Sequence, residues 1–134
     1  MANTPINPDA LFKMAGFHQI VTSSGNTTIH IAGQVAFDKD MQLVGEGDYT
    51  AQTMRVFQNI AIAAEAAGAS PNDVVSSNLY IKGLNPDVSA AVMQGMAKSL
   101  DGKPFPAHAF NMIGVESLSD PRVLIEVSAV AVVE

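Results

Sequence analysis

The sequence predicts an α+β fold in which two helices cover one face of a β-sheet. Three observations predict it. Segments with alternating apolar residues occur toward both ends of the chain, two intervening segments repeat apolar residues every three or four positions, and no linker divides the 134 residues. Two helices can cover only one face of such a sheet. We therefore expect residues 1–134 to form a single domain.

The first half of the chain begins with two expected strands. Residues 17–22 and 28–35 read as short strands, and the loop between them contains Gly25, which is free to adopt a positive φ. This arrangement predicts a β-hairpin. A turn at residues 38–40 and a brief apolar stretch at residues 43–44 follow it.

The next segment changes to helical spacing. Apolar residues recur at three- and four-residue steps between residues 49 and 67, which predicts a one-faced helix. Asp48 is a suitable N-cap and Gly68 a suitable residue just beyond the C-terminal end. A turn beginning at Ser70 and Pro71 then leads to a strand over residues 74–82, where the period returns to two.

A second helix and two further strands complete the expected fold. Asn85 caps a helix expected over residues 86–100, and Gly102 and Pro104 end it. Strands are expected over residues 107–113 and 122–133.

The last of these strands carries the main inference about assembly. One face is wholly apolar and suits the helix side: Val123, Ile125, Val127, Ala129, Ala131 and Val133. The other face is also mostly apolar and carries one carboxylate and one hydroxyl: Leu124, Glu126, Ser128, Val130 and Val132. A sheet face turned to water should be polar, so we expect another copy of the chain to cover it.

Composition excludes several classes of partner. The net charge is −6, and the seven basic residues are scattered, which argues against binding to nucleic acid. No apolar stretch is long enough for a membrane span, the N-terminus does not resemble a signal peptide, and cysteine is absent. The three histidines, at positions 18, 30 and 108, match no metal-binding spacing. We expect a soluble, cytoplasmic protein without metal or cofactor, whose ligand is a small molecule.

Three residues stand out as candidates for chemistry, each with a structural alternative. A carboxylate within an apolar strand is unfavourable unless paired or used, so Glu126 is either part of an ion pair or rim, or positions a ligand or water. His108 follows Pro104 and Pro106 at the start of a strand, where a histidine is more often a core or interface residue than a catalytic one. Gly33 marks a bulge or a close approach of the backbone.

An ordered set of short segments resembles the reactive intermediate deaminase family, called Rid or YjgF-like and also labelled L-PSP endoribonuclease. The resemblance covers about residues 10 to 134. It is carried by these segments in this order: Ile31–Val35, Ala63–Gly68, Asn72–Val75, Leu79–Lys82, Phe105–Ala107 and Ile125–Val132.

The resemblance implies a chorismate-mutase-like fold with a mixed sheet, assembled as a homotrimer whose three sheets form a central barrel. It implies ligand-binding clefts between subunits. Glu126 falls where the family has a glutamate that positions the hydrolytic water, and His108 replaces the arginine that clamps the substrate carboxylate. Phe17 or His18 lies nearest the family's tyrosine. Catalytic roles are therefore expected for Glu126 and His108, and substrate contacts for Phe17, His18, Gly33 and Ser128.

The loss of the arginine shapes the functional hypothesis. A guanidinium grips a carboxylate through two hydrogen bonds, whereas an imidazole offers one per nitrogen and is only partly cationic near neutrality. We expect a trimer that binds a small metabolite and hydrolyses an enamine or imine, releasing ammonia, with weak or absent activity on typical 2-imino acids. Glu126 would orient water, and His108 would act as acid, base or hydrogen-bond donor. The alternative is a non-catalytic sensor or sequestering trimer. Ribonuclease activity is disfavoured by the acidic charge.

Overall fold

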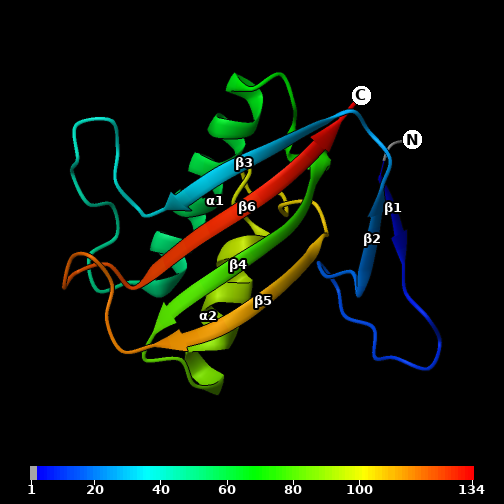
Figure 1. Ribbon diagram of the computed structural model, residues 1–134. Coiled ribbons are helices and arrows are strands. Elements are labelled where there is room, and N and C mark those ends of the chain that lie inside the picture. The colour runs from blue at the N-terminus through cyan, green and yellow to red at the C-terminus, as the bar shows by residue number, and fades with distance from the viewer. Residues whose placement is uncertain (1–2) are drawn as a thin grey trace.

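The computed structural model describes residues 3–134 and places two helices on one face of a sheet (Figure 1). The helices are α1 (Tyr49–Ala66) and α2 (Pro86–Ala97), and a short 3₁₀ helix, η1 (Pro71–Asp73), precedes the fourth strand. The strands are β1 (Asn3–Ile6), β2 (Ile20–Ser23), β3 (Thr27–Gln34), β4 (Val74–Lys82), β5 (Ala109–Val115) and β6 (Ile125–Val133). The predicted α+β class is confirmed.

The main sheet has four strands in the order β3-β6-β4-β5 and is mixed. Strand β6 runs antiparallel to both β3 and β4, whereas β4 and β5 are parallel. A parallel pair needs a crossover connection, and α2 supplies it. Strands β1 and β2 form a separate two-stranded sheet beside this one (Figure 1).

The prediction that residues 17–22 and 28–35 pair as a β-hairpin is wrong. Strand β2 pairs with β1, a strand that the sequence analysis missed, and β3 pairs with β6. Gly25 explains the difference, because a Cβ at this position would lie 2.5 Å from the carbonyl oxygen of Val133. Glycine is therefore needed here because the backbone passes close to the end of β6. It does not form the tight hairpin turn that was predicted between β2 and β3.

The core lies between α1 and the sheet. Phe57, Ile60 and Ala64 of α1 are fully buried, as are Leu79 of β4 and Val127 of β6 on the facing side of the sheet. Burial of each large apolar side chain contributes about 1.5–3 kcal/mol to folding. On the helix face predicted for the last strand, Val123, Ile125, Val127, Ala129 and Ala131 are buried. Val133 of the same face is only half-buried, and Val132 of the other face is buried.

The two predicted caps of α1 are confirmed. The Asp48 carboxylate accepts a hydrogen bond from the backbone N–H of Ala51 at 3.0 Å. Gly68 follows the helix with a φ of 84°, which is a left-handed conformation that glycine adopts without strain.

Several element boundaries differ from prediction: strand β2 covers Ile20–Ser23 instead of residues 17–22, and β5 covers Ala109–Val115 instead of residues 107–113. Helix α2 ends at Ala97 instead of residue 100, because Leu100 and Lys103 exchange backbone hydrogen bonds in a turn. Strand β6 begins at Ile125 instead of residue 122, because the backbone N–H of Leu124 donates to the side-chain oxygen of Gln52 at 2.9 Å. Within residues 3–134, neither helix is long and apolar enough to cross a membrane.

Candidate functional site

The face of the main sheet that the helices leave uncovered carries a row of polar side chains, here called the open face. Tyr80 of β4 lies opposite Glu126 of β6, and Asn78 lies opposite Ser128. The Asn111 side chain on β5 donates a hydrogen bond to the Asn78 side-chain oxygen at 3.1 Å. Glu126 and Ser128 are half-buried. The predicted candidates Glu126 and Ser128 therefore share one surface with an amide pair and a phenol.

The Glu126 carboxylate rests against Gly33 of the neighbouring strand β3. A Cβ on Gly33 would lie 2.3 Å from the Oε2 atom of Glu126. The pairing of β3 with β6 is irregular between Ile31 and Gln34, which is where this glycine lies. The backbone at Gly33 therefore does lie very close to another group, as predicted. That group is the Glu126 carboxylate.

His108 lies on the opposite side of the sheet, inside the core. Its side chain is fully buried between α1 and the sheet, with ring centroids 5.5 Å from Phe105, 5.6 Å from Phe110 and 6.4 Å from Phe57. Its Nδ1 lies 2.9 Å from the carbonyl oxygen of Pro106, which can only accept, so Nδ1 carries the proton. The Ser77 hydroxyl therefore donates to Nε2 at 2.7 Å.

Burial dominates the electrostatics of this histidine. Desolvation lowers the pKa of His108 below its ordinary value, and the charge of nearby His18 lowers it further, while the hydrogen bond to Pro106 acts in the opposite direction. Both ring nitrogens are already used within the fold. The neutral imidazole therefore ties the segment before β5 to β4.

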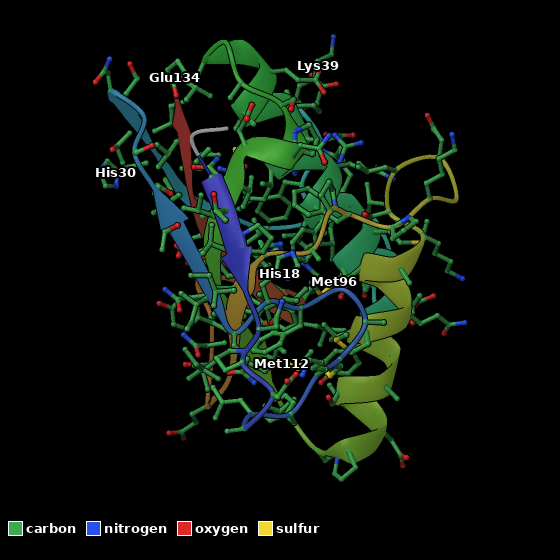
Figure 2. The ribbon with its side chains drawn as sticks, turned by 90° about the vertical axis from the view of Figure 1, so that its right-hand side faces the viewer. His18, His30, Lys39, Met96, Met112 and Glu134 are labelled. Atoms are coloured by element: carbon green, nitrogen blue, oxygen red, sulfur yellow. The ribbon has the colours of Figure 1, made fainter. Side chains whose placement is uncertain are left out.

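The remaining candidates lie near the start of β5. Phe17 stacks on Phe12, with centroids 5.7 Å apart, and packs edge-on against Phe110 at 5.2 Å. His18 accepts a hydrogen bond at Nδ1 from the Asn7 side chain at 3.0 Å. His18 lies near the end of β1 (Figure 2) and lines a cavity of about 650 Å³ between the β1–β2 hairpin and the main sheet.

One protomer does not bring these candidates together. On β5, Ile113 is level with Tyr80 and Glu126, and it lies five residues beyond His108, about 17 Å at about 3.3 Å per residue. Within one protomer the Glu126 carboxylate and the His108 imidazole do not meet, because the two side chains lie on opposite faces and toward opposite ends of the sheet. Gly33, Glu126 and Ser128 form one group. Phe17, His18 and His108 lie at the other end.

The partners of Glu126 on the open face were missed by sequence reasoning. Tyr80 and Asn78 alternate with buried Leu79 and Ile81 on β4, so their outward direction was readable from the period of two. Their position opposite Glu126 depends on the register of β4 with β6, which no local pattern reveals. Within residues 3–134, no group of histidine, aspartate or glutamate side chains is arranged to hold a metal ion.

A family model described as Endoribonuclease L-PSP matches residues 8–133, nearly the whole chain. The chain belongs to this family. It is the Rid, or YjgF-like, family that the ordered segments had indicated.

Relatives within the Rid family span the full length of the chain. A RutC family protein of Pyrococcus abyssi is 38% identical over 132 residues, covering 98% of both chains. The 2-iminobutanoate/2-iminopropanoate deaminase of Dermatophagoides farinae is 26% identical over 132 residues, covering 98% of this chain and 94% of that protein. The crystal structure of the Rid protein YyfB of Yersinia pestis, whose function is unknown, matches with a TM-score of 0.88 at 36% identity, covering 99% of this chain and 100% of YyfB.

Proposed function

We propose that this Rid protein is a homotrimer that binds a small metabolite in clefts between its subunits and hydrolyses an enamine or imine there, releasing ammonia. The reaction adds water across the C=N bond, and the resulting carbinolamine expels ammonia to leave a carbonyl. The deaminase relative from Dermatophagoides farinae supports this reaction class. We place the protein in the cytoplasm, without nucleic-acid partners, from its acidic charge and lack of cysteine.

The position of Glu126 is the observation that carries the proposal. Its carboxylate is half-buried on the open face, fixed against Gly33, and forms no ion pair with any Lys or Arg of residues 3–134. The structural alternative of an ion pair within the protomer therefore has no support. An unpaired carboxylate of this kind can accept a proton from water and orient its oxygen toward an imine carbon.

The separation of the candidate residues supports a site shared between subunits. Glu126 and Gly33 lie at one end of the sheet, whereas Phe17 and His18 lie at the other. A single protomer cannot close a small ligand between them. A second copy that packs on the open face could place its own Phe17–His18 segment beside the first copy's Glu126, while covering apolar residues such as Val130.

Two basic side chains that could have bound a substrate carboxylate are not available to do so, which supports our expectation of weak activity on 2-imino acids. Lys82 follows Tyr80 on the same face of β4, but its ammonium donates to the carbonyl oxygen of Pro121 at 3.2 Å. His108, at the position of the family's arginine, is buried in the core and cannot bind a carboxylate outside it. We expect imines without a carboxylate to be the better substrates.

The buried position of His108 also favours the second candidate function, a binding trimer without catalysis. One of the two side chains expected to take part in proton transfer is absent from the open face, so Glu126 would have to act without it. If catalysis is absent, the same surface would bind a metabolite for sensing or sequestration.

Substitution of Glu126→Gln tests the proposal, because glutamine keeps the packing against Gly33 but is a poor proton acceptor. Ammonia release would be measured from imines generated in place by an amine oxidase and by an amino-acid oxidase. We expect the wild-type chain to accelerate hydrolysis and E126Q to lose about 10²- to 10⁴-fold of that activity. Gly33→Ala should lose activity as well, because its methyl group displaces the carboxylate.

Glu116→Gln is the matched control, since Glu116 is exposed in the loop after β5. It should behave as wild type. Equal activity in E126Q and wild type would exclude Glu126 as the catalytic group. If wild type does not accelerate ammonia release from either imine source, while a small ligand still raises its melting temperature, the binding function replaces the catalytic one.

A further inference from the structure

The proposed hydrolysis needs a proton donor as well as the Glu126 carboxylate. Glu126 removes a proton from water, and the imine nitrogen must gain a proton before ammonia can leave. His108 cannot supply it, because its imidazole is buried in the core and both ring nitrogens are bonded there, to Pro106 and Ser77. A donor on the open face beside Glu126 would complete the reaction.

Tyr80 is the donor that lies level with Glu126 on the open face. The two residues are directly opposite in the antiparallel pairing of β4 with β6. The Cβ atoms of such a pair lie about 4.5–5.5 Å apart. Tyr80 alternates with the buried Leu79 and Ile81, so its phenol points to the open face, where it is half-buried.

Two other titratable donors of this face are farther away or already bonded. His30 lies opposite Val130, four residues along β6 from Glu126, about 13 Å at roughly 3.3 Å per residue. The Lys82 ammonium donates to the carbonyl oxygen of Pro121 at 3.2 Å. Neither is as well placed as the phenol to reach a ligand above Glu126.

The Tyr80 hydroxyl is available to such a ligand. It makes no hydrogen bond within residues 3–134, whereas the hydroxyl of Tyr49, the other tyrosine of the chain, donates to the carbonyl oxygen of Lys82. A phenol is protonated near neutral pH and can donate a hydrogen bond. The fold therefore uses one of the two phenol hydroxyls and leaves the other free.

The carboxylate and the phenol are also far enough apart to hold a substrate between them. The Glu126 carboxylate leans over Gly33 of β3, and β6 lies between β3 and β4 in the sheet (Figure 1). Neighbouring strands are about 4.8 Å apart, so the carboxylate lies about two strand spacings, roughly 10 Å, from the backbone of Tyr80. A water molecule and a C=N group fit in this space.

We infer that Tyr80 is the catalytic acid of this site, an inference that rests on the proposed hydrolysis. In the first step the Glu126 carboxylate takes a proton from water, the water oxygen bonds to the imine carbon, and the C=N π electrons take the phenol proton onto nitrogen. In the second step the Glu126 carboxyl gives its proton to that nitrogen and the C–N bond breaks. The carbinolamine hydroxyl returns a proton to the phenolate as its oxygen becomes the carbonyl.

A substrate that needs no proton in the first step separates this role from packing. A flavin amine oxidase would generate the neutral imine from benzylamine and the N,N-dimethyliminium ion from N,N-dimethylbenzylamine. Benzaldehyde release by the full-length chain would be followed by absorbance at mildly alkaline pH and corrected for the uncatalysed rate. The dimethyliminium nitrogen already carries its positive charge and cannot accept a proton before water adds.

Tyr80→Phe removes only the hydroxyl. We expect Y80F to lose about 10²-fold or more of kcat on the imine, with KM nearly unchanged, and less than about fivefold on the iminium ion. E126Q should lose activity on both substrates, because both need the activated water. Tyr49→Phe is the matched control, and it should keep the wild-type ratio of the two activities even where it lowers the melting temperature.

The outcomes separate this inference from the proposed function. Equal losses on both substrates in Y80F, or no loss on either, would overturn the role of Tyr80 and leave the hydrolysis intact. A loss confined to the imine in His18→Asn, with Y80F unaffected, would assign the proton to His18 instead. A wild type that accelerates neither reaction would overturn the hydrolysis and, with it, this inference.

Discussion

At the scale of single residues, the contrast between His108 and Glu126 decides what each can do. His108 is enclosed by aromatic rings, and both of its nitrogens are bonded within the fold, to Pro106 and Ser77. Glu126 lies on the opposite face, against a glycine. The first geometry favours a neutral structural imidazole, and the second leaves a charged group available to a ligand.

The buried imidazole predicts a dependence of stability on pH. Burial lowers the pKa of His108 in the folded chain, so the unfolded chain binds the proton first as pH falls through about 6.5. The stability that neutral His108 contributes is thus present above pH 6.5 and is lost progressively below it. We expect the free energy of unfolding, measured by urea denaturation, to fall between pH 6.5 and 5.

Two variants test whether His108 causes this change in the free energy of unfolding with pH. His108→Asn should be less stable at neutral pH but should lose less further stability between pH 6.5 and 5 than wild type does. Glu65→Gln, at an exposed position on α1 away from the open face, is the control variant and should keep the slope of wild type. If H108N and wild type show the same slope, a different group titrates.

At the scale of elements, the contact between α1 and α2 depends on one glycine. A Cβ on Gly95 of α2 would lie 2.7 Å from the Thr53 Cβ of α1 and 2.8 Å from the Thr50 carbonyl oxygen. The Thr50 hydroxyl also donates to the Ala91 carbonyl oxygen at 3.0 Å, which holds the helices at this distance. The backbones therefore approach too closely for any side chain larger than hydrogen.

Gly95→Ala tests this contact, because its two effects have opposite signs. Alanine favours a helix by about 1 kcal/mol relative to glycine, whereas overpacking costs about 1–3 kcal/mol. We expect a net loss of stability in urea denaturation. The matched variant Gln94→Ala, at an exposed neighbour on the same helix, should be neutral or slightly stabilising. A stabilised G95A would mean that the helices move apart without penalty.

The helices and strands that have local sequence signals were predictable, and those that depend on distant contacts were not. Helix α1 and strand β4 were predicted almost to the residue, because Asp48, Gly68 and Pro71 are local signals. The hairpin failed because the role of Gly25 depends on Val133, more than 100 residues away in the chain. Strand β1 was missed because its short segment contains a proline and has no periodic pattern of its own.

In the candidate site, too, some residues were predictable from local sequence and others depend on contacts between distant segments. Glu126 was predictable, since a carboxylate in an apolar strand is conspicuous. Its neighbours Tyr80 and Asn78 and the inward direction of His108 follow from strand register, which is set by pairing between distant segments. The resemblance to the family identified His108 as the residue at the arginine's position. It did not reveal that the imidazole is bonded to Ser77 and Pro106 inside the core.

At the scale of the whole molecule, the proposed trimer predicts that a charge on the open face blocks assembly. Val130 lies opposite Ser76 and His30 near the middle of that face. Wild-type protein at micromolar concentration should have the mass of a trimer by light scattering, and Val130→Asp should shift it to monomer. Burying an unpaired carboxylate in an interface is strongly unfavourable. Ile62→Asp, at an exposed position on α1, should remain a trimer. A monomeric wild type would contradict the assembly.

Of the six strands within residues 3–134, β6 is the last, yet it lies in the middle of the main sheet. Strands β3 and β4 reach each other only through it, so a nascent polypeptide cannot close this sheet before residues 125–133 have left the ribosome. Until then α1 has no complete apolar surface to dock on, and its buried stripe is available to chaperones. Folding during synthesis should therefore be late and abrupt, completed in one step when the central strand is inserted.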